Sequence, residues 1–148
     1  MSATVVISLG SNLGNREWYL RAAIEELRHV IHVVRVSSIR ETEPVDAPPP
    51  RYLNAVIAGY TDLSPEAVLR ELQRIETLLG RRRPYRNAPR TIDLDLILHS
   101  ANRRRSRELT LPHPRYRERE FVLEPMRELG LVHQPLGGAD ALVRPAAR

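Results

Sequence analysis

The sequence contains no cysteine and no lysine, and each absence removes a class of chemistry. Without cysteine the chain cannot form disulfides, cysteine-ligated zinc sites or a thiol nucleophile. All 23 basic residues are arginine, so a Walker A lysine and a Schiff-base lysine are also excluded. No run of about 18 apolar residues is present, which argues against a membrane-spanning helix. No cationic stretch precedes the first apolar run, so we expect a cytoplasmic protein without a signal peptide.

The composition is that of one folded domain with an anionic partner. The chain has 148 residues, of which 42% are hydrophobic, enough to build a single core. Its net charge is +5 and its pI is about 10.4. Codon bias is one explanation for the exclusive use of arginine, but the guanidinium fork suits phosphate oxygens whatever its origin. We expect one domain over residues 1–148 that binds a nucleotide, a phosphate-bearing metabolite or nucleic acid.

Apolar periodicity and turn residues predict alternating strands and helices. Strands are expected at residues 4–9, 31–39, 52–60 and 91–99, and helices at residues 16–30 and 65–79. The second helix has clear limits, with Ser64 as N-cap, Pro65 at the first helical position and Gly80 as a stop. We expect these elements to be followed by a hairpin or turn (102–108), a short strand (109–111), a short helix (118–129) and a loosely held tail (135–148) that could contain one strand or turn. The order predicts an α+β fold, a ferredoxin-like βαββαβ sandwich with a mostly antiparallel sheet and C-terminal additions.

Asp93 and Asp95 are the strongest chemical signal in the chain. In a strand the two acids alternate with apolar residues, so both acids point together away from the core. The apolar residues expected to point into the core on the other face are Ile92, Leu94, Leu96 and Leu98. Two residues of strand rise place them about 6.5 Å apart at the backbone. Such a pair could hold Mg²⁺, which prefers oxygen ligands and neutralises a transferring phosphoryl group. The alternative is an exposed strand face with two solvated acids.

Arginines lie just before these acids in the chain. They are Arg81, Arg82, Arg83, Arg86 and Arg90. Cations next to an acidic metal site are expected where a polyphosphate lies between them. The alternative is a solvated charge run or one that binds nucleic acid, and we favour that interpretation for the later arginines at residues 103–107.

A histidine, an asparagine and a phenylalanine add candidate binding groups. His113 stands between two prolines and could bind a phosphate oxygen or move a proton, although a lone histidine is more often structural. Asn54, two residues after Tyr52, can donate to and accept from a flat heterocycle, and Phe121 could stack on one unless it packs in the core. The glycine-rich turn at residues 10–14 precedes a helix but matches neither common phosphate-loop motif.

Several segments together match one family in order and across most of the chain. They are SLGSNLGNR (8–16), YLNAV (52–56), QRIE (73–76), GR (80–81), APRTIDLDLIL (88–98) and LPHPRYREREFVLEP (111–125). The chain thereby resembles the 6-hydroxymethyl-7,8-dihydropterin pyrophosphokinase family of folate biosynthesis. The resemblance implies transfer of pyrophosphate from ATP to the hydroxymethyl group of the pterin, with release of AMP.

The resemblance also implies roles for individual residues. Asp93 and Asp95 would hold two Mg²⁺ ions, and Asp95 would help accept the hydroxyl proton. The implied triphosphate contacts are Arg82 or Arg83, Arg90, His113, Tyr116 and Arg119. The residues implied near the nucleotide are Gln73, Glu76 and Leu96, and those of the pterin pocket are Thr42, Val45, Tyr52, Asn54 and Phe121. Residues 43–51 and 81–89 are expected to be lids that close over the substrates and exclude water.

An RNA-binding module is the competing interpretation. A ferredoxin-like topology, a high pI and scattered arginines all permit it. The aromatic stripe expected on its central strands is missing, and the sequence IDLDL would place two acids on the sheet. We therefore expect a monomeric enzyme with small-molecule partners, ATP and the pterin, and neither nucleic acid nor membrane.

Overall fold

The structure is a computed structural model that describes residues 2–43, 50–80, 90–100, 104–105, 109–136 and 139–143. Its helices are α1 (Arg16–Leu27), α2 (Pro65–Leu78) and α3 (Glu120–Glu128), with a 3-10 turn η1 (Tyr116–Glu118). The strands of its main sheet are β1 (Ala3–Ser11), β2 (His32–Val36), β3 (Arg40–Thr42), β4 (Tyr52–Thr61) and β5 (Asp93–His99). The expected alternation of strands and helices is confirmed.

The main sheet has the predicted ferredoxin-like arrangement. Its strands lie in the order β2-β4-β1-β5, with β3 also paired to β4, and each of these pairings is antiparallel. The buried apolar run of β1 is central because it pairs with β4 on one side and β5 on the other. Both neighbours of β1 are therefore aligned against the same strand, with one register shift in the pairing of β5.

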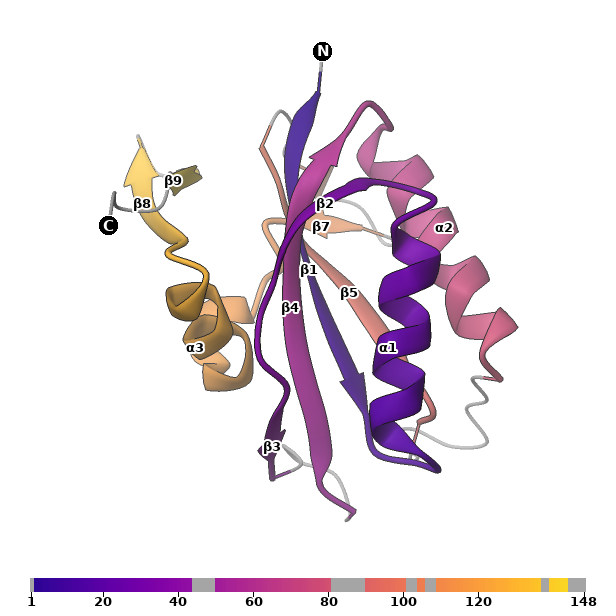
Figure 1. The fold of residues 1–148 in the computed structure, drawn as a ribbon. Coiled ribbons are helices and arrows are strands. Elements are labelled where there is room, and N and C mark those ends of the chain that lie inside the picture. Colours follow the sequence, from indigo (N-terminus) through magenta and orange to yellow (C-terminus); the bar gives the residue numbers. More distant parts are fainter. Residues whose placement is uncertain are drawn as a thin grey trace.

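The two faces of the sheet are covered differently. Helices α1 and α2 lie on one face, and α3 lies on the other (Figure 1). Under α1 and α2, a first hydrophobic cluster joins residues such as Leu20 and Leu72 to the sheet residues Ile7 and Leu94. On the face of α3, a second cluster joins Val122 and Met126 with other residues to Val6, Val56 and Ala58 of the sheet. The sheet is therefore the middle of three layers.

The limits of the helices follow from local signals. Ser64 caps α2, since its Oγ accepts a hydrogen bond from the Ala67 N–H at 3.2 Å, and Pro65 begins the helix as predicted. Gly80 follows α2 with a φ of +84°, a backbone conformation that glycine adopts readily. Helix α1 ends at Leu27 and is therefore three residues shorter than the predicted helix over residues 16–30.

The predicted strand over residues 31–39 ends early, and a separate short strand begins just beyond it. Strand β2 ends at Val36, and β3 resumes pairing with β4 at Arg40. Ser37 lies buried between them, where its N–H donates to the Val56 carbonyl at 2.9 Å and its hydroxyl accepts from the Val56 N–H at 2.8 Å. A side-chain hydroxyl therefore takes the place of one backbone acceptor, and this breaks the regular ladder.

The prediction that Leu98 shares a face with Leu94 and Leu96 is wrong. The register between β1 and β5 shifts, so that Val6 pairs with Leu98 and Ile7 with Leu96. The intervening Ile97 is an extra residue, and such a bulge reverses the alternation of side chains beyond it. Leu98 consequently joins the second cluster, under α3, while Leu94 and Leu96 stay in the first.

In the part of the chain that is described, the C-terminal additions include two small hairpins, η1 and α3. Strand β6 (Arg104–Arg105) pairs with β7 (Thr110–Leu111), in agreement with the predicted hairpin and short strand. Strand β8 (Val132–Leu136) pairs with β9 (Ala139–Val143), where a loosely held tail containing at most one strand or turn was expected. The predicted short helix is present as η1 followed by α3. Among the described residues, none of the helices has the length and apolar character needed to cross a bilayer.

Gly59 allows β2 to approach β4 closely. A Cβ atom at this position would lie 2.2 Å from the backbone carbonyl oxygen of His32, which is far inside any tolerable contact. The register between β2 and β4 shifts at the same place, between Val33 and Arg35. The close packing of the edge strand β2 therefore depends on a glycine near the end of β4.

We expect Gly59→Ala to destabilise the protein by about 2 kcal/mol or more, because backbone has to move to relieve the overlap. Chemical denaturation should measure the loss. Tyr60→Ala, which changes an exposed neighbour on the same strand, is the control and should cost less than about 1 kcal/mol. Equal stability of Gly59→Ala and the unaltered protein would contradict the close approach.

Candidate active site

Asp93 and Asp95 project from the sheet face opposite to α1 and α2. Along β5 the buried residues Leu94 and Leu96 alternate with the two half-buried acids, and both leucines belong to the first cluster. The acids therefore share the face on which α3 lies. The prediction that they point together is confirmed, because the bulge at Ile97 comes after them in the chain.

The register brings an asparagine into line with the first acid. Gly10 of β1 pairs with Asn54 of β4 on one side and with Asp93 of β5 on the other. Directly paired residues of antiparallel strands lie on the same face. In the same way Ser8 of β1 is level with Asp95. A row of polar groups thus crosses three strands at the end of the sheet where β1 finishes.

Gly10 leaves room in this row for two side chains of β4. A Cβ atom at Gly10 would lie 3.2 Å from Cδ1 of Tyr52 and 3.3 Å from Oδ1 of Asn54. Asn54 is held from the other side, where its Nδ2 donates a short hydrogen bond to Oγ1 of Thr42 on β3. Thr42, Tyr52 and Asn54, three of the residues assigned to one pocket, are therefore neighbours on the face that carries the acids.

Arg90 forms an ion pair with the first acid. Its Nη1 lies 2.8 Å from Oδ2 of Asp93, and the two side chains are only 16% and 19% exposed. The Nε of Arg90 is buried and has no hydrogen-bond partner among the described residues. The guanidinium is therefore held beside the acids with donor capacity left over.

Asn12 holds Arg90 in place and also joins a second chain segment. Its Oδ1 accepts from the Arg90 N–H at 2.7 Å, and its own N–H donates to the Arg90 carbonyl at 3.0 Å. Its Nδ2 donates to the Pro50 carbonyl at 3.1 Å, and the residue is 2% exposed. Asn12 thus joins Pro50 to Arg90, two residues that are 40 positions apart in the chain.

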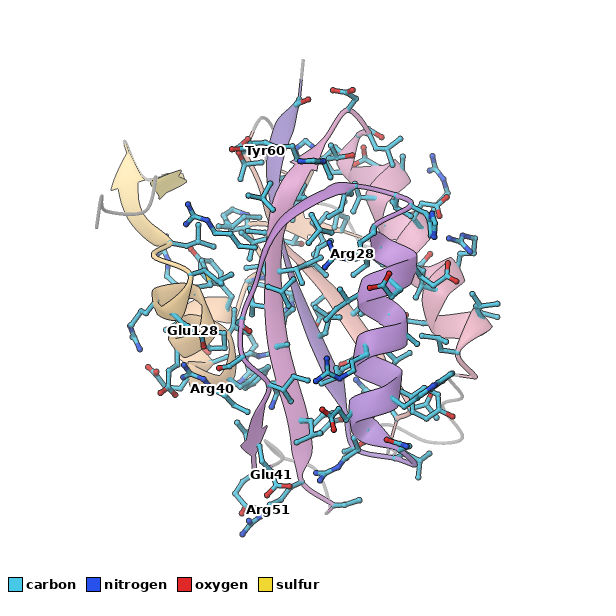
Figure 2. The ribbon with its side chains drawn as sticks, in the orientation of Figure 1. Arg28, Arg40, Glu41, Arg51, Tyr60 and Glu128 are labelled. Carbon is cyan, nitrogen blue, oxygen red and sulfur yellow. The ribbon has the colours of Figure 1, made fainter. Side chains whose placement is uncertain are left out.

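Ion pairs strengthen the same end of the sheet. Arg16 of α1 lies 2.9 Å from Glu41 of β3 and donates at 2.9 Å to the carbonyl of Arg51, whose side chain is 3.4 Å from Glu41. Glu41 and Arg51 lie side by side at the end of β3 and β4 (Figure 2). The hydrogen bond from Arg16 is the main cause that lowers the pKa of Glu41. The first helix is thereby attached to the strands that bear Thr42 and Tyr52.

His113 is placed beside β5 and stays neutral. Its backbone N–H donates to the Ile97 carbonyl at 2.9 Å. Its ring Nδ1 accepts a hydrogen bond from the backbone N–H of Arg115 at 3.3 Å, so Nε2 carries the ring proton. Burial, followed by the charges of Arg119 and Arg115, lowers the pKa of His113 to about 4, although Asp93 opposes the shift. His113 is thus a neutral hydrogen-bond donor between an arginine and the first acid.

Phe121 lies at the beginning of α3 on the same side of the sheet. It is half-buried and packs against the second cluster, so it combines a core contact with an exposed part of its ring. The guanidinium carbon of Arg119 lies 5.6 Å from the centre of the Phe121 ring. The α3 side of the site therefore presents an aromatic ring with a cation next to it.

Comparison with known proteins assigns the chain to a family. A family model described as 7,8-dihydro-6-hydroxymethylpterin-pyrophosphokinase matches residues 6–130. The chain belongs to this family. A relative from Bacillus subtilis (strain 168), named 2-amino-4-hydroxy-6-hydroxymethyldihydropteridine pyrophosphokinase, is 42% identical over 132 residues, which cover 87% of this chain and 79% of the relative. A protein of the same name from Aquifex aeolicus (strain VF5) is 32% identical over 86% of this chain and 80% of its own length.

A longer protein also contains a related segment. The folic acid synthesis protein fol1 of Pneumocystis carinii is 42% identical over 137 residues, which are 90% of this chain but only 18% of that protein. The resemblance inferred from the sequence motifs is therefore confirmed for the pterin pyrophosphokinase family.

Most of the residues that the family resemblance singles out, where they are described, lie together. The structure brings onto one face of the sheet Asp93, Asp95, Arg90, His113, Arg119, Thr42, Tyr52, Asn54 and Phe121. Val45, Arg82 and Arg83 lie outside the described residues. The roles assigned to all of these residues stay predictions.

The three residues expected near the nucleotide belong to the other face of the sheet. Gln73 is exposed on α2, and Leu96 is part of the first cluster under α1 and α2. Glu76 is 6% exposed, and its Oε2 accepts a hydrogen bond from the Leu94 N–H at 2.8 Å. Glu76 therefore joins α2 to β5 directly behind the acids.

Tyr116 also differs from its expected surroundings. It is 1% exposed and is one of the largest side chains of the second cluster, and burial raises the pKa of its hydroxyl. Its ring belongs to this cluster together with Val122 and Met126 of α3. A contact with triphosphate, as the family resemblance implies, stays a prediction.

The acids suit a metal that takes few protein ligands. Among the side chains that the structure describes, no three or more His, Asp or Glu residues gather closely enough to hold an ion. Two carboxylates with a neutral His113 nearby leave most ligand positions to water and phosphate oxygens, which is how Mg²⁺ is commonly bound. The donor set of this face therefore fits Mg²⁺ delivered with a polyphosphate and does not fit a closed structural metal site.

Sequence analysis missed the structural role of Asn12. The motif around this residue matched the family, but nothing in its letters assigned a role to Asn12. The one available signal was a conformational one, namely a polar residue directly after a buried strand and before a turn. Its partners, Pro50 and Arg90, are distant in the sequence, so only the folded chain shows that it joins them.

We expect His113 to make the stability of the protein depend on pH. The folded pKa of about 4 lies below the ordinary 6.5, so the unfolded chain binds more protons and stability falls as pH drops from 6.5 toward 4. Between about pH 7.5 and pH 5 the loss should be at most about 2 kcal/mol, reduced by solvent screening because the ring is only partly buried. Denaturation of the unaltered protein and of His113→Gln at both pH values measures it. An equal pH dependence in both proteins would contradict the assignment.

We expect Glu76→Ala to lower the free energy of unfolding by about 1–3 kcal/mol, because it leaves the Leu94 N–H buried without this acceptor. Gln73→Ala, on an exposed position of the same helix, is the matched control and should change stability by less than about 0.5 kcal/mol. Denaturant titration measures the free energy of unfolding of both variants and of the unaltered protein. Unchanged stability of Glu76→Ala, together with weaker ATP binding, would instead assign Glu76 to the nucleotide.

Proposed function

We propose that this protein transfers the pyrophosphoryl group of ATP to the hydroxymethyl group of 6-hydroxymethyl-7,8-dihydropterin, forming the pterin diphosphate and AMP in folate biosynthesis. Membership of the pterin pyrophosphokinase family supports the reaction. The observation that carries it is the single sheet face on which two acids, an arginine, a neutral histidine and an amide-lined aromatic region meet. We further propose that the chain is a single domain that acts as a cytoplasmic monomer.

The phosphate side of the site is formed by the acids and their cationic neighbours. Asp93 and Asp95 would hold two Mg²⁺ ions, which supply neutralisation of the charge on the triphosphate. Arg90, whose guanidinium is paired with Asp93 through Nη1, would add positive charge beside the phosphate. His113 would donate from Nε2, and Arg119 would add a second guanidinium. Gln73, Glu76, Leu96, Tyr116 and either Arg82 or Arg83 are the remaining predicted nucleotide contacts.

The pterin side is formed by β3, β4 and the start of α3. The hydrogen bond from Asn54 Nδ2 to Thr42 fixes the orientation of the amide, so that its oxygen points toward Gly10. A planar heterocycle could meet this amide edge-on and stack on Phe121, with Tyr52 and Val45 completing the pocket. The reaction then needs mainly positioning, with the hydroxymethyl group presented to the phosphate side.

Asp95 is the proposed acceptor of the hydroxyl proton. It lies two residues further along β5 than Asp93 and on the same face of the sheet. As the hydroxymethyl oxygen attacks the β-phosphorus, its proton has to leave, and a carboxylate in reach can take it. AMP departs as the bond between the α- and β-phosphoryl groups breaks.

An RNA-binding module would use the same sheet face differently. In such modules the exposed sheet carries aromatic side chains on which bases stack. Here α3 packs on that face through Val122 and Met126, and the uncovered end presents Asp93 and Asp95. Negative charge at that position repels a phosphate backbone unless a divalent cation intervenes.

We expect the protein with Mg²⁺, ATP and hydroxymethyldihydropterin to produce AMP, and Asp95→Asn to reduce the turnover by at least about 100-fold. Separation of nucleotides measures both. The matched control is Asp62→Asn, an exposed aspartate that accepts a hydrogen bond from Ser2 far from the site, and it should retain activity. Formation of ADP, salt-sensitive RNA binding without turnover, or full activity of Asp95→Asn would overturn the proposal.

A further inference from the structure

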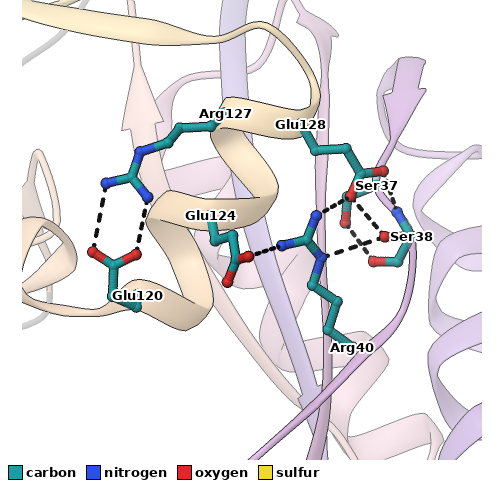
Figure 3. Close-up of polar contacts among 7 residues, drawn as sticks. All are labelled: Ser37, Ser38, Arg40, Glu120, Glu124, Arg127 and Glu128. Atoms are coloured by element: carbon teal, nitrogen blue, oxygen red, sulfur yellow. Dashed lines mark hydrogen bonds and ion pairs between the residues drawn. The ribbon is translucent and has the colours of Figure 1, made fainter.

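Arg40 joins α3 to the strands that carry the proposed pterin side. Its Nη1 lies 2.7 Å from Oε1 of Glu124 and its Nη2 lies 2.8 Å from Oε1 of Glu128, both on α3 (Figure 3). Its own position is on β3, level with Asn54 of β4. One guanidinium therefore spans the boundary between the sheet and the helix above it.

Further contacts fix the same end of α3. Ser38 donates to the Glu128 carboxylate twice, from its N–H at 2.7 Å and from its hydroxyl at 2.6 Å. These bonds from Ser38, followed by that from Arg40, lower the pKa of Glu128. Arg35 of β2 donates at 2.5 Å to the carbonyl of Leu129, one of the carbonyls at the helix end. We call Arg40, Glu124, Glu128 and Ser38 the α3 clamp.

The clamp acts on the strand side at the pocket residues themselves. On β3, Arg40 and Thr42 are two residues apart and so lie on the same face, opposite Asn54 and Tyr52 of β4. Thr42 is the residue that accepts the hydrogen bond from the Asn54 amide. The position of Arg40 is thus coupled through one short strand to the group proposed to recognise the pterin edge.

On the helix side the clamp follows the face that bears Phe121. Phe121, Glu124 and Glu128 are spaced i, i+3 and i+7, which places them along one stripe of an α-helix. The apolar contacts of Val122 and Met126 give α3 its attachment, but burial of apolar area is not directional. Charge-assisted hydrogen bonds from a planar guanidinium are directional, so they set how the helix is placed along the strand.

We propose that Arg40 is a positioning residue that sets the separation between Phe121 and the Asn54–Thr42 pair, and so governs affinity for the pterin rather than for ATP. This inference rests on the proposed function. Arg40 touches no substrate in it. A small error in the relative placement of the two walls weakens stacking and edge recognition together, while Asp93, Arg90 and His113 are held by β5 and Asn12 and keep their positions.

The test compares three variants by steady-state kinetics with each substrate varied in turn. Arg40→Met keeps the apolar stem and loses the charge, and it should raise the KM for the pterin about 10-fold or more while the KM for ATP changes less than about 2-fold. Arg40→Lys keeps a cation but cannot reach both carboxylates with a planar fork. Its KM for the pterin should therefore lie between that of the unaltered protein and that of Arg40→Met. Arg127→Ala removes an ion pair to Glu120 within the same helix and should match the unaltered protein.

Amide hydrogen exchange gives a second measurement that does not use activity. Arg40→Met should speed exchange in α3 and in β3, and leave β1 and β5 unchanged. An unaltered protein that forms no AMP would overturn the proposed function, and the exchange measurement would still decide whether the clamp holds α3. Unchanged pterin KM in Arg40→Met, or equal rises in both KM values, would overturn the inference, as would exchange identical to that of the unaltered protein.

Discussion

The candidate site depends on the antiparallel pairing of β1 with β4 and β5 at once. Because β1 is central, Gly10 is level with Asn54 on one side and with Asp93 on the other, and their side chains share a face. Residues more than 80 positions apart in the chain, at 10 and 93, thereby meet. The absence of a side chain at Gly10 then leaves the space into which Tyr52 and Asn54 lean.

The charged residues around this site also join neighbouring parts of the structure to one another. Asn12 holds the backbone of Arg90, whose guanidinium pairs with Asp93, and Arg16 attaches α1 to the strand ends. Arg40 does the same for α3. In a chain whose cations are all arginine, several planar forks thus bridge two elements each, a task for which their geometry is well suited. We inferred from the sequence that the arginines bind an anionic ligand. In the structure several of them also hold together the elements around the proposed site.

Sequence reasoning succeeded where a local rule decided the outcome. The alternation of Asp93 and Asp95 with apolar neighbours placed both acids on one face, and Ser64 with Pro65 marked the start of α2. It failed where a distant partner intervened. The bulge at Ile97 moved Leu98 to the other face, and the hydroxyl of Ser37 interrupted the strand expected over residues 31–39. The buried surroundings of Glu76 and Tyr116 likewise depend on elements far away in the chain.

The sequence by itself determined the family, the order of the elements and the identity of the paired acids, because motifs and short-range periodicity are written along the chain. Only the tertiary structure decided which candidate residues meet. The tasks of Asn12 and Arg40 could not be read from neighbouring letters, since each is defined by partners that strand register and helix packing bring to it. Register is a property of two strands together, and a shift of one residue exchanges the faces of a sheet.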